Sequence, residues 1–426
     1  MILQDLKIVE TNIRIFGKNN FSMKNVFTLF IYIISSTTLL SQNIDFFDSN
    51  FKEALVNDAV VDIDNDDLGD VPADFNKDGE IQVSEAESID GLFIIDKNIS
   101  SLDGIENFSN LERLNCEFNF IQELDFSANL ALREVRASFN ELGTIKVSDN
   151  INLERLHVRS NELTEIDVSQ NSNLTRLFCH NNLLTEIDVS NNTNLEFLYV
   201  YENLLSNIDV SSNPNLQHLF CNTNQIESLD LSQNPQLTRL LCFENDLTNL
   251  DLSGNINLEV LYAWENSLSI LDLSQNANLL DIRCYQNDLT SLNLQNGNNT
   301  AFEEVRIYEN PNLLCVQVDD IDYANSQDNW HKDEIASYSV DCGVLGEESV
   351  SLQEITLFPV PANDRIRLID FNGEIKEYQI LNLQGTVLIE GTKYEDEISI
   401  EGLSSGVYFI RILSEKNQKT IKFIKV

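Results

Sequence analysis

The sequence predicts a solenoid of 21-residue coils, rich in β-structure with a concave parallel sheet, followed by a small β-sandwich. The first observation is a 21-residue pattern that repeats from residue 111 to residue 302. The second is that its apolar positions recur in fixed columns, and the third is that short alternating strands replace it after residue 352. The first column consists of Leu111, Leu132, Leu153, Leu174, Leu195, Leu216, Leu237, Leu258 and Leu279. One such coil cannot bury its apolar side alone, so the coils must stack.

Each coil contains the segment L-x-x-L-x-C/V/A-x-x-N, in which alternate side chains of a strand should face inward and outward. The Leu and Cys columns are predicted to point inward. Five cysteines share one column with Val and Ala, which predicts buried free thiols; they are Cys116, Cys179, Cys221, Cys242 and Cys284. An Asn closes the segment in every coil, because its amide can satisfy buried backbone groups of a turn. An Asp column in the second half of the coil should be solvated.

Two outward columns of the predicted strands carry aromatic residues and arginines. The candidate binding residues are Arg136, Arg159, Phe178, Tyr199, Tyr201, Phe220, Phe243, Tyr262, Trp264, Tyr285 and Tyr308. Exposed apolar patches mark interaction sites, and aromatics with Arg supply most binding hot spots. These columns therefore predict a ligand surface. The alternative is a cross-strand ladder that only stabilises the sheet, and the pattern does not choose between a protein and a polysaccharide ligand.

An acidic segment before the coils contains DFNKDGEIQVSE, from Asp74 to Glu85. Its oxygen-bearing residues match the twelve-residue calcium loop of an EF-hand, and Gly79 stands where the chain must turn sharply. The predicted ligands are Asp74, Asn76, Asp78, the carbonyl of Glu80, and Glu85. Pro72 disfavours an entering helix, so we expect a structural calcium that braces the N-terminal end of the coils. A plain acidic turn is the alternative.

The repeated segment resembles the leucine-rich repeat in the short form found in secreted bacterial proteins. The resemblance covers about residues 91–341 and implies a right-handed, curved solenoid with a parallel sheet on its concave side. Residues 91–110 resemble a shortened entry coil, and residues 310–342 resemble a closing cap in which Trp330 covers the last coil. Cys315 and Cys342 lie outside the Cys column near the end of the array and are predicted to form a disulfide.

Residues 352–426 resemble the type A C-terminal sorting domain of the type IX secretion system. The segments that carry the resemblance are Phe358-Pro359-Val360-Pro361-Ala362-Asn363-Asp364, Asn382-Leu383-Gln384-Gly385, Leu403-Ser404-Ser405-Gly406-Val407-Tyr408 and the Lys-rich end, 419–426. The resemblance implies the type IX secretion machinery as a partner. It also implies passage across the outer membrane, and then removal of the module or attachment to the cell surface. A structural sandwich without a sorting role is the alternative.

The remaining segments complete the predicted domain organisation. Residues 1–42 are a leader with a signal peptide that starts at Met23 and has a short apolar run. Residues 43–90 hold the calcium loop, residues 91–342 form the repeat array with its cap, and residues 343–351 are a linker to the module at 352–426. Nothing else is long and apolar enough to span a bilayer, so we expect no transmembrane segment in the mature chain.

The charge and motif content exclude several classes of function. Lys and Arg number 27 against 69 Asp and Glu, a net charge of -42, which disfavours binding to nucleic acid or anionic lipid. No hydrolase motif or metal-ligand spacing of His and Cys is present, so an enzyme is not expected. We expect a secreted protein, or one attached to the outer surface of a Gram-negative bacterium, that captures an extracellular protein or polysaccharide on its concave aromatic face. The alternatives are a structural envelope or matrix protein and an accessory subunit of a secreted degradative enzyme.

Overall fold

The computed structural model describes residues 42–342, 356–369, 377–382, 386–392, 397–413 and 418–426. Its contacts divide the chain into two units, with the boundary after Cys342. The predicted signal peptide, the whole linker at 343–351 and residues 383–385 of the sorting-domain resemblance lie outside the described residues. Each unit has its own hydrophobic core.

The first unit begins with an N-terminal segment that packs onto the first coil. Helix α3 (Ser49–Asn57) buries Phe51 and Leu55, and Asp48 caps it by accepting hydrogen bonds from two backbone N–H groups. The second carboxylate oxygen of Asp48 accepts a hydrogen bond from the backbone N–H of Ser100, 2.6 Å away, which ties the helix to the coils. Helix α4 (Val83–Ala86) follows the acidic loop and is only one turn long.

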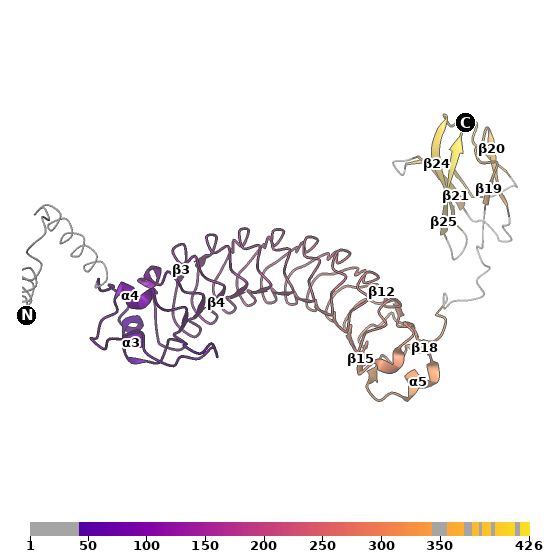
Figure 1. Cartoon of the computed structure of the whole chain (residues 1–426). Helices are drawn as coiled ribbons and strands as arrows, with labels where there is room; N and C mark the ends of the chain where they lie inside the picture. Colours follow the sequence, from indigo (N-terminus) through magenta and orange to yellow (C-terminus); the bar gives the residue numbers. More distant parts are fainter. Residues whose placement is uncertain (1–41, 343–355, 370–376, 383–385, 393–396, 414–417) are drawn as a thin grey trace, which may run out of the picture. The chain divides into compact units, whose positions relative to one another are not determined.

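The predicted concave sheet is confirmed, with twelve parallel strands in one sheet. The strands are β1 (Gly91–Phe93), β2 (Arg113–Asn115), β4 (Glu134–Arg136), β6 (Arg155–His157), β7 (Arg176–Phe178), β8 (Phe197–Tyr199), β9 (His218–Phe220), β10 (Arg239–Leu241), β11 (Val260–Tyr262), β13 (Asp281–Arg283), β15 (Glu304–Arg306) and β17 (Trp330–His331). Figure 1 shows the array as an arc, with β4 and β15 on its inner side and β12 on its outer side. The register keeps equivalent residues opposite each other, as where Leu198 pairs with Leu177 and Leu219.

The outer side of the arc carries shorter sheets that the sequence did not predict. Strands β3 (Glu123–Asp125) and β5 (Thr144–Lys146) pair at the N-terminal end, and β12 (Ile270–Asp272), β14 (Ser291–Asn293), β16 (Cys315–Gln317) and β18 (Ser337–Ser339) pair at the C-terminal end. Between β5 and β12 the described chain forms no strand on that side. Pairing needs a spacing of about 4.8 Å, and coils spread apart on the outer side of an arc.

The predicted inward columns form one continuous core, in which the Leu and Cys side chains of the coils are buried. The Asn column forms the hydrogen bonds expected of it. Asn182 accepts a hydrogen bond from the backbone N–H of Leu163 at 3.0 Å and donates to the carbonyl oxygens of Val158 and Cys179. We call this set of equivalent bonds, which runs from Asn119 to Asn310, the amide ladder.

The return turn of each coil uses two further polar columns. A second Asn column is buried, and each member donates from its side-chain amide to two carbonyl oxygens of the coil before it, as Asn192 does to Val168 and Asn171. The Asp column is solvated, as predicted. Each carboxylate accepts the backbone N–H of the Ser two residues later, as Asp188 does from Ser190 at 2.9 Å. The hydrogen bonds from Ser190 lower the pKa of Asp188.

The closing cap has the predicted form. Helices η1 (Ile105–Asn107) and η2 (Asn299–Ala301) lie within the array, and α5 (Ile321–Ser326) lies in the cap. Trp330 is buried against Phe302 and Tyr338.

The Cys315–Cys342 disulfide is confirmed, and the five cysteines of the inward column are free and buried. Burial raises the pKa of Cys179 to about 12, so its thiol stays protonated and behaves as a small apolar group.

The second unit is the predicted β-sandwich of two antiparallel sheets. One sheet contains β19 (Thr356–Phe358), β20 (Arg365–Ile369) and β23 (Ile398–Ser399); the other contains β22 (Val387–Gly391), β21 (Glu377–Leu381), β24 (Gly406–Leu413) and β25 (Gln418–Lys425). Its core includes Ile366, Ile380, Ile410 and Phe423. The ammonium group of Lys425 donates to the carbonyl oxygen of Asn363, which joins the last strand to the turn after β19.

Candidate functional site

The inner face carries three outward columns rather than the two predicted from the sequence. The first residue of each inner strand also points outward, which adds Arg155, Arg176, Phe197, His218 and Arg239. Side chains that alternate across a strand place positions i, i+2 and i+4 on one face. Extending that alternation by one step toward the N-terminus of each strand would have found this column.

The aromatic side chains form two runs of stacked rings, which we call the ring ladder. The first run joins His157, Phe178, Tyr199 and Phe220, with centroids 4.4, 4.3 and 4.2 Å apart. The second run occupies the next column and joins Phe243, Trp264, Tyr285 and Tyr308, with centroids 3.8, 5.3 and 4.9 Å apart. Tyr201 stacks on His180 at 4.1 Å. Tyr262 belongs to neither run, because its ring lies under Arg283 and its hydroxyl donates to Asp281.

Stacking changes what the ring ladder offers to a ligand. The rings within each run are nearly parallel, with interplanar angles between 5° and 14°. A ring inside a run therefore has both faces covered by its neighbours, and it shows its edge to solvent. The side chains are half-buried rather than fully exposed. The expectation of a broadly exposed apolar patch was wrong in this respect.

The arginines of the inner face fall into two groups. Arg136, a predicted binding residue, is bound to Glu134 at 2.5 Å and to Asp67 of the N-terminal acidic loop at 3.1 Å, so the chain itself occupies its guanidinium. By contrast, Arg159 lies over the ring of Phe139, and Arg176 lies over the ring of Phe197. Arg159, Arg176 and Arg239 form no ion pair with the acidic residues of the described chain.

The middle of the inner face contains no acidic residue, although the chain carries a net charge of -42. We call this stretch of six coils the acid-free window. Its outward residues are Arg155, His157, Arg159, Arg176, Phe178, His180, Phe197, Tyr199, Tyr201, His218, Phe220, Asn222, Arg239, Leu241, Phe243, Val260, Tyr262 and Trp264. Glutamates border it on both rims, among them Glu196 and Glu259 on one side and Glu202 and Glu265 on the other.

Two histidines in the acid-free window are held neutral. Burial, and after it the nearby guanidinium of Arg159, lowers the pKa of His180 to about 4. Burial likewise lowers the pKa of His157 to about 4, with Arg136 and Arg176 adding to the effect. Nδ1 of His180 and Nε2 of His157 are buried and have no hydrogen-bond partner. The acid-free window thus contains polar groups without a partner. In the last coils, by contrast, Arg283 is paired with Asp281 and Arg306 with Glu304.

The predicted calcium loop has the backbone shape that such a loop requires. Gly79 has a φ of +85°, in the left-handed region that favours glycine. Asp74 accepts hydrogen bonds from the backbone N–H groups of Asp78 and Gly79, and Glu85 accepts one from Asn76 at 3.1 Å. The loop residues of the prediction therefore lie around one short turn.

Oxygen atoms of this loop converge on the side-chain amide of Gln82. Its Nε2 lies 3.2 and 3.3 Å from the two carboxylate oxygens of Asp78, 3.4 Å from the carbonyl oxygen of Glu80 and 3.4 Å from Oδ1 of Asn43. The Glu80 side chain turns away to Lys52. Oxygen atoms gathered in this way are the kind of ligand that a hard cation prefers. Of the five predicted ligands, Asp78 and the carbonyl of Glu80 belong to this group. Asn43 was not among the predicted ligands.

A second acidic loop lies between α3 and the calcium loop. The carboxylates of Asp62, Asp64 and Asp70 lie close enough together to hold a metal, but Asp62 is already bound by Arg113 at 2.8 Å. The loop also contributes Asp67 to Arg113 and Arg136. The loop therefore forms ion pairs with two arginines at the N-terminal end of the inner face.

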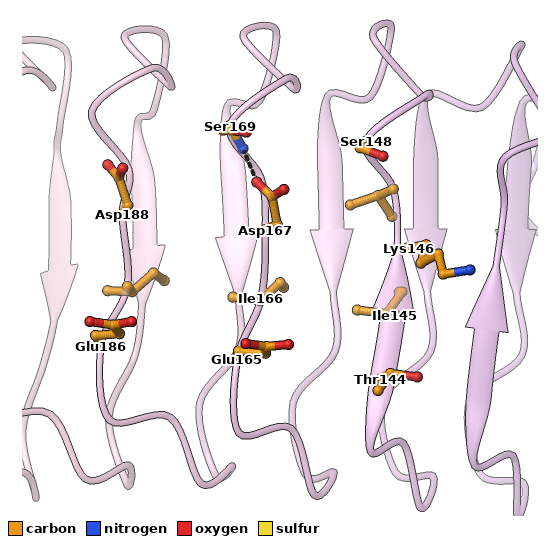
Figure 2. A pocket seen from close by; sticks show the side chains of 12 residues that line it. Thr144, Ile145, Lys146, Ser148, Glu165, Ile166, Asp167, Ser169, Glu186 and Asp188 are labelled. Atoms are coloured by element: carbon orange, nitrogen blue, oxygen red, sulfur yellow. Dashed lines mark hydrogen bonds between the residues drawn. The ribbon is translucent and has the colours of Figure 1, made fainter.

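The outer face has a hollow where strand pairing ends after β5. Figure 2 shows its lining residues, including Lys146, Glu165, Asp167, Glu186 and Asp188, and the hydrogen bond from the backbone of Ser169 to Asp167. The Asp side chains are used in turns of the coils. The hollow is thus a gap between coils in which acidic side chains meet solvent, and nothing in it converges on a ligand.

Comparisons with known proteins give one family match and several similar solved structures. Residues 356–426 match the family model of the secretion system C-terminal sorting domain. Among solved structures, the chain is similar to the functional domain of InlJ from Listeria monocytogenes, which includes a cysteine ladder, at 26% identity over 70% of this chain and 71% of that chain, with a TM-score of 0.49. It is also similar to an internalin from the same organism at 19% identity (68% and 96%, TM-score 0.39) and to YopM from Yersinia enterocolitica at 23% identity (54% and 52%, TM-score 0.41). No curated protein matches the chain.

The repeated coils with their inner parallel sheet define a leucine-rich repeat protein. The match at residues 356–426 adds a sorting domain of the type IX secretion system, so this is an exported leucine-rich repeat protein that is secreted or attached to the cell surface. Within the described residues no helix is long and apolar enough to cross a membrane.

Proposed function

We propose that this exported protein binds another protein on the acid-free window of its inner face, without catalysing a reaction. The observation that carries the proposal is the combination of half-buried ring edges with arginines that have no acidic partner. Aromatic and Arg side chains supply most hot spots of protein interfaces. We further propose that residues 23–41 act as the export signal and that the protein is displayed on the outer surface of a Gram-negative bacterium.

Ring orientation favours a protein over a polysaccharide. A sugar presents weakly positive C–H groups, which pack on the negative face of an aromatic ring. In the ring ladder those faces are covered by neighbouring rings, as at Tyr199 between Phe178 and Phe220. The free edges carry partial positive charge and suit carbonyl and carboxylate oxygens, which a polypeptide supplies.

The test uses the full chain as bait with purified extracellular proteins and a glycan array. We expect proteins to bind and the glycan array to stay blank, and we expect replacement of Tyr199, Tyr201, Phe243 and Trp264 by Ala to abolish binding. Phe47→Ala is the matched control, because Phe47 is an exposed aromatic side chain outside the repeat columns. Binding that survives the fourfold substitution in a folded protein would place the site elsewhere.

A structural role is the second candidate, because ring faces covered by other rings stabilise the array whether or not a ligand binds. This role predicts that the fourfold variant melts at a lower temperature while no partner is lost. The melting temperature and the binding assay together separate the two functions.

We also propose that the loop at residues 74–85 holds a structural calcium. Asp74, Asn76, Asp78, the carbonyl of Glu80, and Glu85 would hold the ion, with Asn43 close by. A bound cation would brace the segment that packs on the first coil. We expect calcium to raise the melting temperature, and both a chelator and Asp78→Ala to remove that rise. Equal melting of the wild-type protein with and without calcium would refute the site.

A further inference from the structure

Four polar side chains lie together at the N-terminal end of the acid-free window. Ser138, Arg159 and His180 occupy the same column of three successive coils, which are joined by hydrogen bonds from Phe139 N–H to the Arg159 carbonyl and from Ser160 N–H to the His180 carbonyl. Coils paired in this way are about 4.8 Å apart. His157 stands two residues before Arg159 on the same face.

This cluster holds more hydrogen-bonding capacity than the chain uses. Oγ of Ser138, Nε2 of His157 and Nδ1 of His180 are buried without a partner, and Ser138 and His180 are 0% and 5% exposed. Arg159 has no ion pair within residues 42–342. Buried polar groups in native proteins are nearly always hydrogen-bonded, so each exception needs an explanation.

The chemistry of the four groups points to an anion. Arg offers only donors, a neutral imidazole offers one N–H, and a hydroxyl can donate or accept. The lowered pKa of both histidines keeps them neutral at neutral pH, so the cluster carries one formal positive charge, on Arg159. Such a set complements the two oxygens of a carboxylate. The net charge of -42 of the chain disfavours a dianion more strongly than a monoanion.

An apolar platform adjoins the cluster. Phe118 and Phe139 stack at 4.5 Å, are 49% and 37% exposed, and belong to the coils just before Arg159. Both have a positive φ, 59° and 57°, a costly conformation for a bulky residue. The equivalent residues in the next coils are Ser160, Asn181 and Glu202. The guanidinium of Arg159 lies 5.0 Å from the ring centroid of Phe139, which joins the platform to the cluster.

We propose that Ser138, His157, Arg159 and His180 form a carboxylate-binding site for an acidic side chain of the protein partner, and that Phe118 and Phe139 receive an apolar side chain next to it. The inference rests on the proposed function, since it names one contact of the same inner face. It identifies the partner's contact segment as an acidic residue beside an apolar one. The flanking glutamates of the rims favour basic residues further out along that segment.

The test titrates the full chain with N-acetylglutamate N-methylamide and, as the neutral match, N-acetylglutamine N-methylamide. Nuclear magnetic resonance of the imidazole nitrogens reports binding, and His218 and His331 serve as internal references. We expect saturable shifts at His157 and His180 with the glutamate probe alone. Arg159→Gln should weaken binding roughly tenfold or more, as loss of a charge-assisted hydrogen bond does. Arg133→Gln removes an exposed arginine bound to Glu154 and should change nothing.

Several outcomes would overturn the site. They are no shift at either histidine, equal shifts with the neutral probe, or unchanged affinity in an Arg159→Gln protein that melts like the wild type. Tighter binding of inorganic sulfate than of the glutamate probe would also reject a carboxylate. If Arg159→Gln fails to fold, Arg159→Lys keeps the charge, and its loss of the planar fork should still weaken probe binding. The titration needs no partner, so its result is independent of whether the fourfold aromatic variant loses capture.

Discussion

Two ladders run along the same coils, and they differ in regularity. The amide ladder repeats in each coil from Asn119 to Asn310 with the same donors and acceptors. The ring ladder changes column, and it breaks where Leu241 and Asn222 replace rings. A residue that is the same in every coil, such as the Asn of the amide ladder, is required for the coils to stack. At positions that vary between coils, such as those of the ring ladder, stacking does not determine the residue, so binding of a partner can determine it.

The largest effect is expected from breaking the amide ladder. Asn203→Ala leaves the buried N–H of Leu184 without its acceptor at 3.0 Å. It also removes one of the two side-chain amide donors from each of the carbonyl oxygens of Cys179 and Val200, which keep Asn182 and Asn224 as donors. A buried group left unpaired costs about 1–3 kcal/mol, and each hydrogen bond lost from a group that keeps another partner costs about 1 kcal/mol, so we expect a loss of roughly 3 kcal/mol in a denaturant melt. Asn194→Ala is the control, because its bond to Ser172 is exposed, and it should cost under about 0.5 kcal/mol. Equal losses in the two variants would mean that burial of the hydrogen-bonded groups does not increase their contribution to stability.

The pH dependence of stability is the next largest effect. The pKa values of His157 and His180 fall to about 4 on folding, below the ordinary value of about 6.5. The unfolded chain then binds more protons between pH 6.5 and pH 4, so stability falls as the pH is lowered through that range. Without screening, each shift would correspond to about 3 kcal/mol. Because solvent reaches the inner face and screens these charges, we expect a smaller loss, on the order of 2 kcal/mol for the pair.

The carboxylates of the chain titrate in the same range, so the histidine contribution is read as a difference. The wild-type stability should fall by the histidine contribution between pH 6.5 and pH 4, and the double variant His157→Phe/His180→Phe should lack that part of the fall. The difference in stability between the two proteins should therefore be constant above pH 6.5 and change below it. Parallel curves would show that these rings are not held neutral by burial.

Truncating one ring should cost less than breaking the amide ladder. Tyr199→Ala removes two stacked contacts, with Phe178 at 4.3 Å and Phe220 at 4.2 Å. Stacked pairs are worth about 0.5–1.5 kcal/mol each beyond burial, so a loss of about 2 kcal/mol is expected in the same melt. Leu241→Ala, in the gap of the ladder, should cost less, and an equal or larger loss there would show that stacking adds nothing.

The sequence predicted the scaffold well because every coil has the same need to bury its apolar side and to pair its buried backbone groups. The residue at a given place in one coil stacks on the residue at the same place in the next coil, so the buried columns and the amide bonds followed from spacing alone. The Cys315–Cys342 bridge was predicted because these two cysteines stand outside the repeat.

The site was only partly predictable, because its properties depend on contacts between different parts of the chain. The sequence predicts Arg136 as a binding residue, but Asp67, which is 69 residues away, forms an ion pair with its guanidinium. The half-buried rings arise from stacking, which a pattern of aromatic letters does not reveal. His180 and Ser138 became candidates only when burial showed their polar atoms without partners. Spacing predicts which side chains face outward, whereas partners and burial need coordinates.

Filling the gap of the ring ladder gives the smallest effect and the sharpest comparison. In Leu241→Phe a new ring would stand between Phe220 and Tyr262, which flank it in register on β9 and β11. If the ladder only stabilises the sheet, the variant should gain about 1 kcal/mol and leave partner capture unchanged. If the gap is part of the binding surface, the same gain in stability should come with weaker capture, because a ring edge would fill the space that the partner uses. A melt and a binding titration on this one variant distinguish a ring ladder that only stabilises the sheet from one that is part of a binding surface. Ile256→Phe is the matched control, because Ile256 is exposed.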